Sequence, residues 1–473
     1  MEERLSKISV DGMREIRDLD GSLDGRCVSV RGFVFKSSCT GKYIFIVLRD
    51  GGCTVQCMCE KPTDGSGGLT MPEFSSLRKV THESYIEIRG RVVKQGMEIS
   101  GCSKKDIEVR ILGFRVLSIA DKSLPFAMKD VSATAEEREK NPTLQNVAYH
   151  IRLDNRAMDL RAPQTRATFR VVDGVMFFFR TYLRQNGFME IKTSKLIGSS
   201  SEGGANLFSV DYFKRKAFMA QSPQLYKQMA IVGGFKRVYE IGHVYRAEES
   251  NINRYLSEFV GLDMEMEICT DYNDVIRFIH SMLVSIFDNL KKEYGEELET
   301  IRAFHAFEDL KYRRDPVVLT HRECVDLLLN EGVEMGYEDD FNSESEKKLG
   351  SVVRRMHGVD IFVIKDYPIS TRPFYTYRDE EKGITRSYDF ILRGQEILSG
   401  AQRVSIYKDL VKYVEEHGIS PSSLGGYLES FKYGAPPHGG CGIGLERLMK
   451  AYFGMGDIRC FSLFPRDPNR LYP

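Results

Sequence analysis

Residues 439–448 read Gly-Gly-Cys-Gly-Ile-Gly-Leu-Glu-Arg-Leu, a run of glycines that ends in a cation. Glycine has no Cβ, so the backbone of such a run can approach a ligand closely. Arg447 stands where a helix is expected to begin, and its guanidinium can lie against a phosphate there. The run lacks the lysine of a phosphate loop and does not fit the dinucleotide-binding glycine pattern. By itself it could equally be a turn in which a helix packs on a strand.

Two segments earlier in the chain carry similar signals. Residues 244–248 read Val-Tyr-Arg-Ala-Glu, and after a polar loop residues 255–259 read Tyr-Leu-Ser-Glu-Phe. An arginine at the end of a strand can bind phosphate through its planar fork of donors. The ring of Phe259 on the returning strand can stack on a base. Most Arg-x-Glu pairs are surface ion pairs, so this signal alone is weak.

The pattern of apolar residues around these segments predicts alternating helices and strands. Apolar residues recur at helical spacing between 171 and 183, which predicts a helix that ends at Gly187. Phe188–Ile191 begins an extended segment. Between Leu262 and Ile268, apolar residues alternate with acidic ones, namely Asp263, Glu265 and Glu267. This strand has one acidic face, which could be solvated or could form the floor of a site that binds cations.

In order and context, residues 188–193, 244–259 and 439–448 resemble motifs 1, 2 and 3 of the class II aminoacyl-tRNA synthetases. Further segments resemble the aspartyl branch of subclass IIb, in its eukaryotic and archaeal type: Ser-Glu-Gly-Gly-Ala at 201–205, Gln-Ser-Pro-Gln at 221–224 with Lys227, Ser-Gly-Ala-Gln-Arg at 399–403, and Leu-Phe-Pro-Arg-Asp-Pro at 463–468. The resemblance covers nearly the whole chain. Two positions depart from the family pattern, because Ser194 replaces a proline of motif 1 and Tyr255 replaces an arginine or histidine of motif 2.

The N-terminal part has the pattern of a small barrel. Five short β-type segments, at 27–35, 43–49, 53–59, 85–93 and 107–116, are separated by turn residues. The OB fold is one candidate, although strand count alone does not separate it from other small barrels. With the resemblance, we expect an α+β protein: a five-stranded OB-fold barrel followed by a class II catalytic domain built on an antiparallel sheet flanked by helices. The expected boundaries are a short extension at 1–24, an anticodon-binding OB domain at 25–118, a hinge at 119–150 and the catalytic domain at 151–473.

The resemblance implies a two-step reaction in which a homodimer attaches L-aspartate to tRNA-Asp. ATP and aspartate would first form aspartyl-adenylate, with Mg²⁺ present, and the aspartyl group would then pass to the 3′-terminal ribose hydroxyl. The alternatives are an asparaginyl-tRNA synthetase or a non-discriminating aspartyl enzyme, an aspartate–ammonia ligase, and an inactive RNA-binding paralogue. Lys227 opposes the asparaginyl alternative, and the barrel opposes the ammonia ligase. The retained Arg246, Arg403 and Arg447 oppose an inactive paralogue.

The resemblance also implies the residues of the ATP site. Arg246 would contact the α-phosphate and Phe259 the adenine, and Arg447 would cover the other adenine face and reach the γ-phosphate. Arg246 and Arg447 would be the catalytic residues. The same ATP-site set also contains Glu248, Arg254, Glu396 and Gly444. The expected Mg²⁺ ligands are Asp389, Glu396 and Ser399, whose hard oxygen donors suit this ion.

For aspartate, the resemblance places the ammonium near Glu202, Gln224 and Asp263, with Ser399 close by. It places the β-carboxylate at Lys227 and Arg403. Asparagine would leave these cations unpaired in a dry pocket, which is costly. The small residues Ser199–Ala205 suit either a mobile lid or a plain surface loop.

In the barrel, the resemblance implies that Phe45 stacks on the central anticodon base and that Gln56 and Glu83 contact base edges. Phe45 as ordinary barrel core is the alternative.

Composition excludes several classes of protein. The 473 residues contain 67 Lys plus Arg and 67 Asp plus Glu, and this balance argues against a protein that coats DNA through bulk charge. No apolar run has the length of a membrane span, and residues 1–4 lack the pattern of a secretory signal, so we expect a cytoplasmic protein. Cys53, Cys57 and Cys59 lack a matching second half of a zinc site and are expected to be packing residues.

Overall fold

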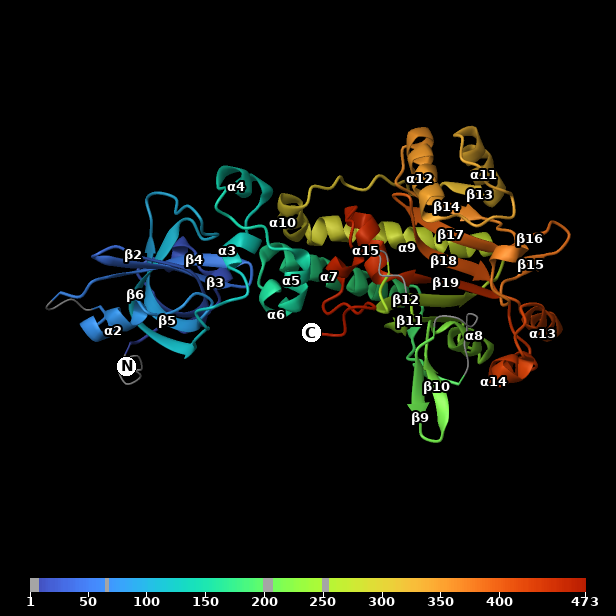
Figure 1. Ribbon diagram of the computed structural model, residues 1–473, viewed down its shortest axis with the longest axis horizontal. Helices are drawn as coiled ribbons and strands as arrows, with labels where there is room; N and C mark the ends of the chain where they lie inside the picture. Colours follow the sequence, from blue (N-terminus) through green and yellow to red (C-terminus); the bar gives the residue numbers. More distant parts are fainter. Residues whose placement is uncertain (1–7, 64–67, 199–206, 249–254) are drawn as a thin grey trace. The chain divides into compact units, whose positions relative to one another are not determined.

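The computed structural model describes residues 8–63, 68–198, 207–248 and 255–473. The chain divides into two compact units, Met1–Arg166 and Ala167–Pro473, and each is considered by itself. Figure 1 shows the strands of the first unit in blue and the sheet of the second in green to red. Among the described residues, no helix is both long and apolar enough to cross a membrane.

The first unit contains the predicted barrel. Its strands are β2 (Cys27–Cys39), β3 (Tyr43–Asp50), β4 (Cys53–Glu60), β5 (Tyr85–Lys94) and β6 (Ile107–Ser118), with the short β1 (Met13–Arg14) beside β2. The order β2-β3-β4-β6-β5, together with pairing of β2 to β5, closes the sheet on itself. Alternate residues such as Ile44, Ile46 and Leu48 fill the interior. The five predicted strands and the OB barrel are confirmed.

The barrel cysteines behave as the sequence predicted. Cys57 and Cys59 are buried in the barrel core, where burial raises the pKa of the Cys59 thiol to about 11. Such thiols stay protonated and pack as small apolar groups. The loop before β5 contains α2 (Met71–Leu77), which begins at a capping box between Thr70 and Glu73.

Short helices follow the barrel. They are α3 (Met128–Val131), α4 (Ala135–Lys140), α5 (Tyr149–Asp154) and α6 (Arg156–Asp159). The segment expected to be a hinge therefore contains two helices, α3 and α4. The buried Arg156 donates to Asp159 over 2.7 Å, which fixes the turn that leads into the next helix. The division between the two units falls between Arg166 and Ala167, later than the expected domain boundary.

The second unit is built on one large sheet. In the part of the chain that the structure describes, its order is β13 (Val318–Thr320), β14 (Ile361–Lys365), β17 (Ser387–Leu392), β18 (Gln395–Gln402), β19 (His438–Gly444), β12 (Glu258–Glu267), β11 (Arg237–Tyr245) and β7 (Met189–Glu190). The strands from β14 to β11 are antiparallel, whereas β13 and β7 join the edges in parallel. The predicted fold is confirmed, with a sheet that is mixed at its edges.

One face of this sheet is covered by long helices. α7 (Pro163–Gln185), α9 (Tyr272–Glu293) and α15 (Leu445–Phe453) pack their apolar sides against Leu262 and Met264 of β12 and Ile443 of β19. α10 (Gly295–Phe304) completes this layer. The predicted helix is part of α7, and Gly187 follows it with φ +78°, a conformation that glycine tolerates best.

The remaining elements surround the open face or extend the sheet. Helix α8 (Gln224–Val232) packs against β11 and β12, with α14 (Gly425–Phe431) beside α8 and α13 (Tyr407–Glu416) beside α14. Helices α11 (His321–Asn330) and α12 (Ser343–His357) lie near β13 and β14 in Figure 1. The short strands β8 (Leu196–Ile197), β9 (Ser209–Tyr212) and β10 (Arg215–Met219) form one small sheet. A second small sheet contains β15 (Arg378–Asp379) and β16 (Ile384–Thr385).

Candidate active site

The glycine run is the strand β19 at the centre of the large sheet, rather than a loop or a turn. Gly440, Gly442 and Gly444 alternate with Cys441 and Ile443, which are buried in the core under the opposite face. A Cβ on Gly440 would lie 2.1 Å from the Met264 carbonyl oxygen and 2.6 Å from Glu265 Oε2. These glycines therefore give the acidic side chains of β12 the space that they occupy.

Strand register brings distant polar residues into two rows on the open face. Asp263, Gly442, Ser399 and Asp389 are aligned across β12, β19, β18 and β17. The parallel row contains Glu265, Gly440, Ala401 and Ser387. Because side chains alternate between faces, rows two residues apart face the same way. The acidic face of β12 is thus the floor of a site, and the solvated alternative is excluded by the burial of Asp263 and Glu265.

A cavity of about 330 Å³ opens above this floor. The three arginines that the sequence analysis singled out, Arg246, Arg403 and Arg447, all line it. Eight other residues named in the sequence analysis also line the cavity: Gln224, Glu248, Tyr255, Phe259, Asp263, Glu396, Ser399 and Gly444. Residues from widely separated segments therefore form one cleft.

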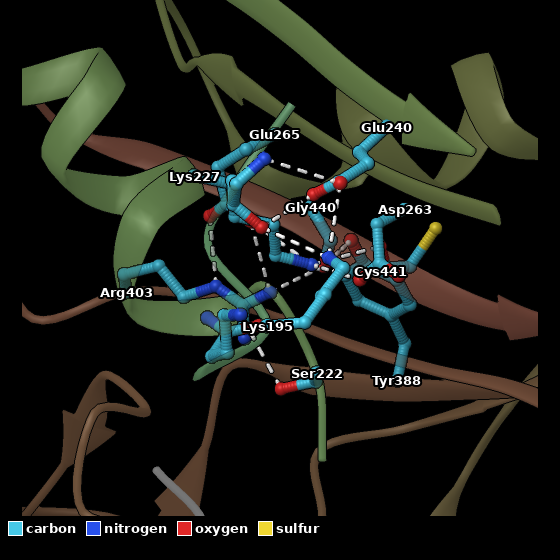
Figure 2. A network of polar contacts seen from close by, with 12 residues as sticks. Lys195, Ser222, Lys227, Glu240, Asp263, Glu265, Tyr388, Arg403, Gly440 and Cys441 are labelled. Carbon is cyan, nitrogen blue, oxygen red and sulfur yellow. Dashed lines mark hydrogen bonds and ion pairs between the residues drawn. The ribbon is translucent and has the colours of Figure 1, made fainter. Parts of the chain in front are cut away.

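Figure 2 shows a network of buried charges that includes Arg403 and Asp263, two residues that line the cavity. The Glu265 carboxylate accepts hydrogen bonds from Arg403 Nε at 2.8 Å and Nη2 at 3.1 Å. Lys227 Nζ lies 3.6 Å from Glu265 Oε2 and donates to Asp263 Oδ1 over 2.9 Å. Burial alone would raise the pKa of Glu265, but the two cations outweigh it and hold that pKa below its ordinary value.

Backbone carbonyls of the glycine strand complete this network. Lys227 donates to the Cys441 oxygen over 3.0 Å, and Arg403 Nη2 donates to the Gly440 oxygen over 2.9 Å. Lys227 is buried and does not itself line the cavity, although Asp263, to which it donates, does. Among the described residues, neither Arg403 Nη1 nor the buried Nε2 of Gln224 has a hydrogen-bond partner. Both are donors that a ligand in the cavity could use.

The other end of the cavity combines arginines with an aromatic ring. The guanidinium carbon of Arg246 lies 5.6 Å from the centroid of the Phe259 ring, one strand away. Arg447, in the first turn of α15, places Nη1 3.3 Å from Glu396 Oε1. Loss of hydration and the negative charge of the neighbouring Asp389 together raise the pKa of Glu396 to about 7. Flat rings and guanidinium forks next to oxygen donors suit a nucleotide with its phosphates.

Comparison with known proteins matches both units. A family model described as "tRNA synthetases class II (D, K and N)" matches residues 148–468, and "OB-fold nucleic acid binding domain" matches residues 28–117. The chain is 50% identical, over 100% of its length and 99% of the relative's, to a probable cytoplasmic aspartate–tRNA ligase of Enterocytozoon bieneusi. This chain belongs to the aspartate–tRNA ligases of class II.

A further curated relative and two solved structures that resemble the synthetase are also aminoacyl-tRNA ligases. The human cytoplasmic aspartate–tRNA ligase is 40% identical, covering 97% of this chain and 91% of its own. A solved aspartyl-tRNA synthetase from Entamoeba histolytica superimposes with a TM-score of 0.89 at 36% identity, covering 99% and 94% of the two chains. A solved asparaginyl-tRNA synthetase from Pyrococcus horikoshii reaches a TM-score of 0.81 at 26% identity, covering 97% and 98%.

The synthetase holds two of the expected metal ligands in an unforeseen way. Asp389 does not line the cavity, and both of its oxygens accept hydrogen bonds from Arg372, at 3.1 and 2.6 Å. Arg372 Nη1 also donates to Ser399 Oγ over 3.1 Å. Within the described residues, no group of three or more His, Cys, Asp and Glu side chains could hold a metal ion.

Three functional candidates of the synthetase did not come from the sequence. Glu265 was visible only as one acid of the alternating strand, without a role. Arg372 directly follows the short 3-10 helix Ile369–Thr371 and carries no sequence signal. Glu446 is buried beside the cavity, which raises the pKa of its carboxyl to about 8 although it accepts from the Val260 N–H.

The barrel residues that were expected to read the anticodon have different surroundings. Phe45 is half-buried and lies outside the core, between the core residues Ile44 and Ile46. Gln56 is half-buried and donates to Glu108 over 2.7 Å. Glu83 is only 4% exposed and is paired with Arg49 at 2.7 Å and Arg161 at 2.9 Å. The expected site residues Glu202 and Arg254, and the possible lid at 199–205, lie outside the described residues.

Proposed function

We propose that this synthetase activates L-aspartate with ATP and transfers the aspartyl group to the 3′-terminal hydroxyl of tRNA-Asp. The observation that carries the proposal is a single cavity with two chemically different ends. One end lies over Arg403, Asp263 and Glu265, and the other has Arg246, Phe259 and Arg447. An amino acid with an anionic side chain suits the first end and ATP suits the second.

Recognition of aspartate would depend mainly on Arg403. Glu265 holds two of its nitrogens, so the guanidinium is fixed in place and offers Nη1 to the β-carboxylate. Lys227, which is buried and bonded to Asp263, would act through its charge and by orienting Asp263 toward the substrate ammonium. Asparagine would offer Arg403 Nη1 a neutral amide in place of a carboxylate, and so lose a charge-assisted hydrogen bond that contributes about 1.5–3 kcal/mol.

Gln224 offers both a donor and an acceptor at the same end. Its Nε2 has no partner among the described residues and would donate to a substrate carboxylate, while its amide oxygen can accept from the ammonium. These contacts would orient the α-carboxylate toward the nucleotide. A side chain nearly fully buried before ligand binding loses little freedom when the ligand arrives.

The first reaction step would need little acid–base help from the protein. An oxygen of the substrate α-carboxylate attacks the α-phosphorus of ATP, the bond to the bridging oxygen breaks, and pyrophosphate leaves. The attacking carboxylate is already ionised, so no general base is required. Arg246 on the α-phosphate and Arg447 on the outer phosphates would neutralise the developing charge, and Phe259 would hold the adenine. In the second step the ribose hydroxyl attacks the carbonyl carbon, and AMP leaves.

The oxygen donors beside the phosphates fit Mg²⁺. Glu396 and Ser399 line the cavity, and Asp389 is paired with Ser399 across β17 and β18. With so few protein oxygens available, the ion would be held largely by phosphate oxygens, as Mg²⁺ usually is at nucleotide sites. When bound, Mg²⁺ would neutralise phosphate charge and favour the leaving of pyrophosphate.

The barrel would bind the anticodon through its outer face. Phe45 lies outside the core, and Gln56 pairs with Val47 of the same face, two residues along the strand. An aromatic ring with an amide beside it suits stacking and edge contacts to single-stranded bases. Glu83 is buried between two arginines, so we propose that it acts by holding Arg49 rather than by touching a base directly.

A homodimer would form along the edge of the large sheet at β7. This edge carries the exposed Met189, and α7 exposes the ring of Phe177, which is 53% accessible. An unpaired strand edge beside apolar side chains is a typical subunit interface. Light scattering should give twice the mass of one chain.

Side-by-side aminoacylation of purified tRNA-Asp and tRNA-Asn, with aspartate and with asparagine, tests the function. We expect aspartyl transfer to tRNA-Asp. Arg403→Ala should reduce aspartate-dependent pyrophosphate exchange at low aspartate by about 10- to 100-fold, from the loss of a charge-assisted hydrogen bond. Arg378→Ala, which removes an arginine paired with Glu416 outside the cavity, is the matched control. Near wild-type exchange by Arg403→Ala at low aspartate would refute the proposal, and preferential asparagine exchange would favour an asparaginyl enzyme.

A further inference from the structure

Arg372 binds two of the three residues that are expected to hold Mg²⁺, Asp389 and Ser399. Its two terminal nitrogens bind the two oxygens of Asp389, and Nη1 also reaches Ser399 Oγ. The two side chains of the ion pair are only 9% and 5% exposed. Of the three oxygen donors expected for Mg²⁺, only Glu396 has no contact with this guanidinium.

Arg372 is held in place from a second side. Its guanidinium carbon lies 3.6 Å from the ring centroid of Tyr367, which is itself buried. A cation over an aromatic face is attracted by the ring. The pairing is therefore a built arrangement of ring, guanidinium and carboxylate, rather than a chance surface contact.

Arg372 can also contact a ligand in the cavity. Arg372 lines the cavity, and its buried Nε has no hydrogen-bond partner among the residues that the structure describes. A guanidinium binds phosphate as well as it binds carboxylate, through the same planar fork. It could therefore exchange Asp389 for a phosphate of the nucleotide without moving far along the floor.

A guanidinium that binds both oxygens of a carboxylate disfavours a divalent cation at that carboxylate, because the two positive charges repel. We propose that Arg372 is a resident cation that closes Asp389 to divalent metals in the free enzyme. The metal would then enter together with ATP, whose phosphates draw Arg372 away and leave Asp389 available. This inference rests on the proposed ATP site and adds an order of events to it.

Binding of Mn²⁺ to the free full-length protein, without ATP or aspartate, tests the inference. The free-ion signal in electron paramagnetic resonance reports the affinity. We expect weak binding by wild type and at least tenfold tighter binding by Arg372→Met. The double variant Arg372→Met, Asp389→Asn should return to the wild-type value. Equal affinity of wild type and Arg372→Met would overturn the inference.

The chain provides a matched control. Arg378 also pairs with a carboxylate, that of Glu416, and lies 3.8 Å over the ring of Tyr413, but it does not line the cavity. Arg378→Met should leave Mn²⁺ affinity unchanged. Tighter binding by both methionine variants would attribute the effect to general loss of positive charge, and would overturn the inference.

Two further arms cover the case in which Arg372→Met does not fold. Arg372→Lys keeps the charge but loses the fork, so it should bind Mn²⁺ between two- and tenfold more tightly than wild type. Asp389→Asn alone should leave Mn²⁺ binding unchanged, because Asp389 is already occupied. Weaker binding by Asp389→Asn would overturn the inference. Pyrophosphate exchange by wild type is measured separately, so failure of the proposed function remains distinguishable.

Discussion

Of the charged residues in the cavity floor, Glu265 should be the one whose neutralisation destabilises the protein most. Its carboxylate is fully buried and holds Arg403 with two hydrogen bonds, while Lys227 lies 3.6 Å away. Glu265→Gln keeps the shape of the side chain but leaves Arg403 buried without its anionic partner. Removing one member of a buried ion pair costs about 3–5 kcal/mol. For a unit of this size that corresponds to roughly 6–10 °C in melting temperature.

The same substitution should weaken aspartate binding. Arg403 would lose the partner that orients it, and a charge-assisted hydrogen bond contributes about 1.5–3 kcal/mol. We therefore expect the KM for aspartate in pyrophosphate exchange to rise about 10- to 100-fold, with a smaller effect on the KM for ATP. The nucleotide end should be less affected because Arg246 and Phe259 are not bonded to Glu265.

Glu267→Gln is the matched control, since Glu267 lies two residues further on the same strand and is partly exposed. Thermal melting and exchange kinetics of both variants are measured in parallel. The reasoning is refuted if Glu265→Gln melts within about 2 °C of Glu267→Gln and has the same KM for aspartate. That result would mean that neighbouring dipoles and water, rather than Glu265, compensate the two cations.

Three other changes give clear expectations. Gly440→Ala should destabilise the second unit by about 3 kcal/mol or more, because the new Cβ would lie 2.1 Å from a carbonyl oxygen, whereas Gly426→Ala in open space should be neutral; denaturant unfolding distinguishes them. Glu446 has a pKa raised to about 8, above its unfolded value of 4.5, so wild type should lose stability as pH rises from 4.5 to 8. Glu446→Gln should lack this loss in melts across that range, and parallel curves would contradict it. Phe259→Leu should raise the KM for ATP by about 5- to 100-fold, as loss of base stacking predicts, and an unchanged KM would exclude stacking.

Local patterns made most of the fold predictable. Strand alternation in the barrel places residues such as Ile44 and Ile46 inside, and each of the five strands was predicted near its observed position. The acidic alternation of β12 was also visible, because a strand's two faces can be read from a few consecutive residues. The strand formed by the glycine run was harder to predict, because glycines favour loops and turns. The neighbouring strands β12 and β18 approach it so closely that side chains larger than glycine would clash with them.

The parts of the site that escaped prediction depend on how distant segments meet. Lys227 was predicted beside the substrate, but its contacts with Asp263 and the Cys441 carbonyl were not, because they join α8 to β12 and β19. The pairing of Arg372 with Asp389 joins the end of a short 3-10 helix to the strand β17. No periodicity within either segment encodes such a contact, so only the folded chain reveals it.

The middle strand of the sheet also limits how this enzyme could be given a new substrate. Cβ atoms on Gly440 and Gly442 would lie 2.6 and 3.0 Å from the carboxylates of Glu265 and Asp263, so the part of the pocket base that β19 forms cannot be changed by substitution. A different amino acid could be accommodated only by changing the walls, chiefly Gln224 and Arg403. Directed evolution toward another side chain should therefore accumulate replacements there and leave the glycines untouched.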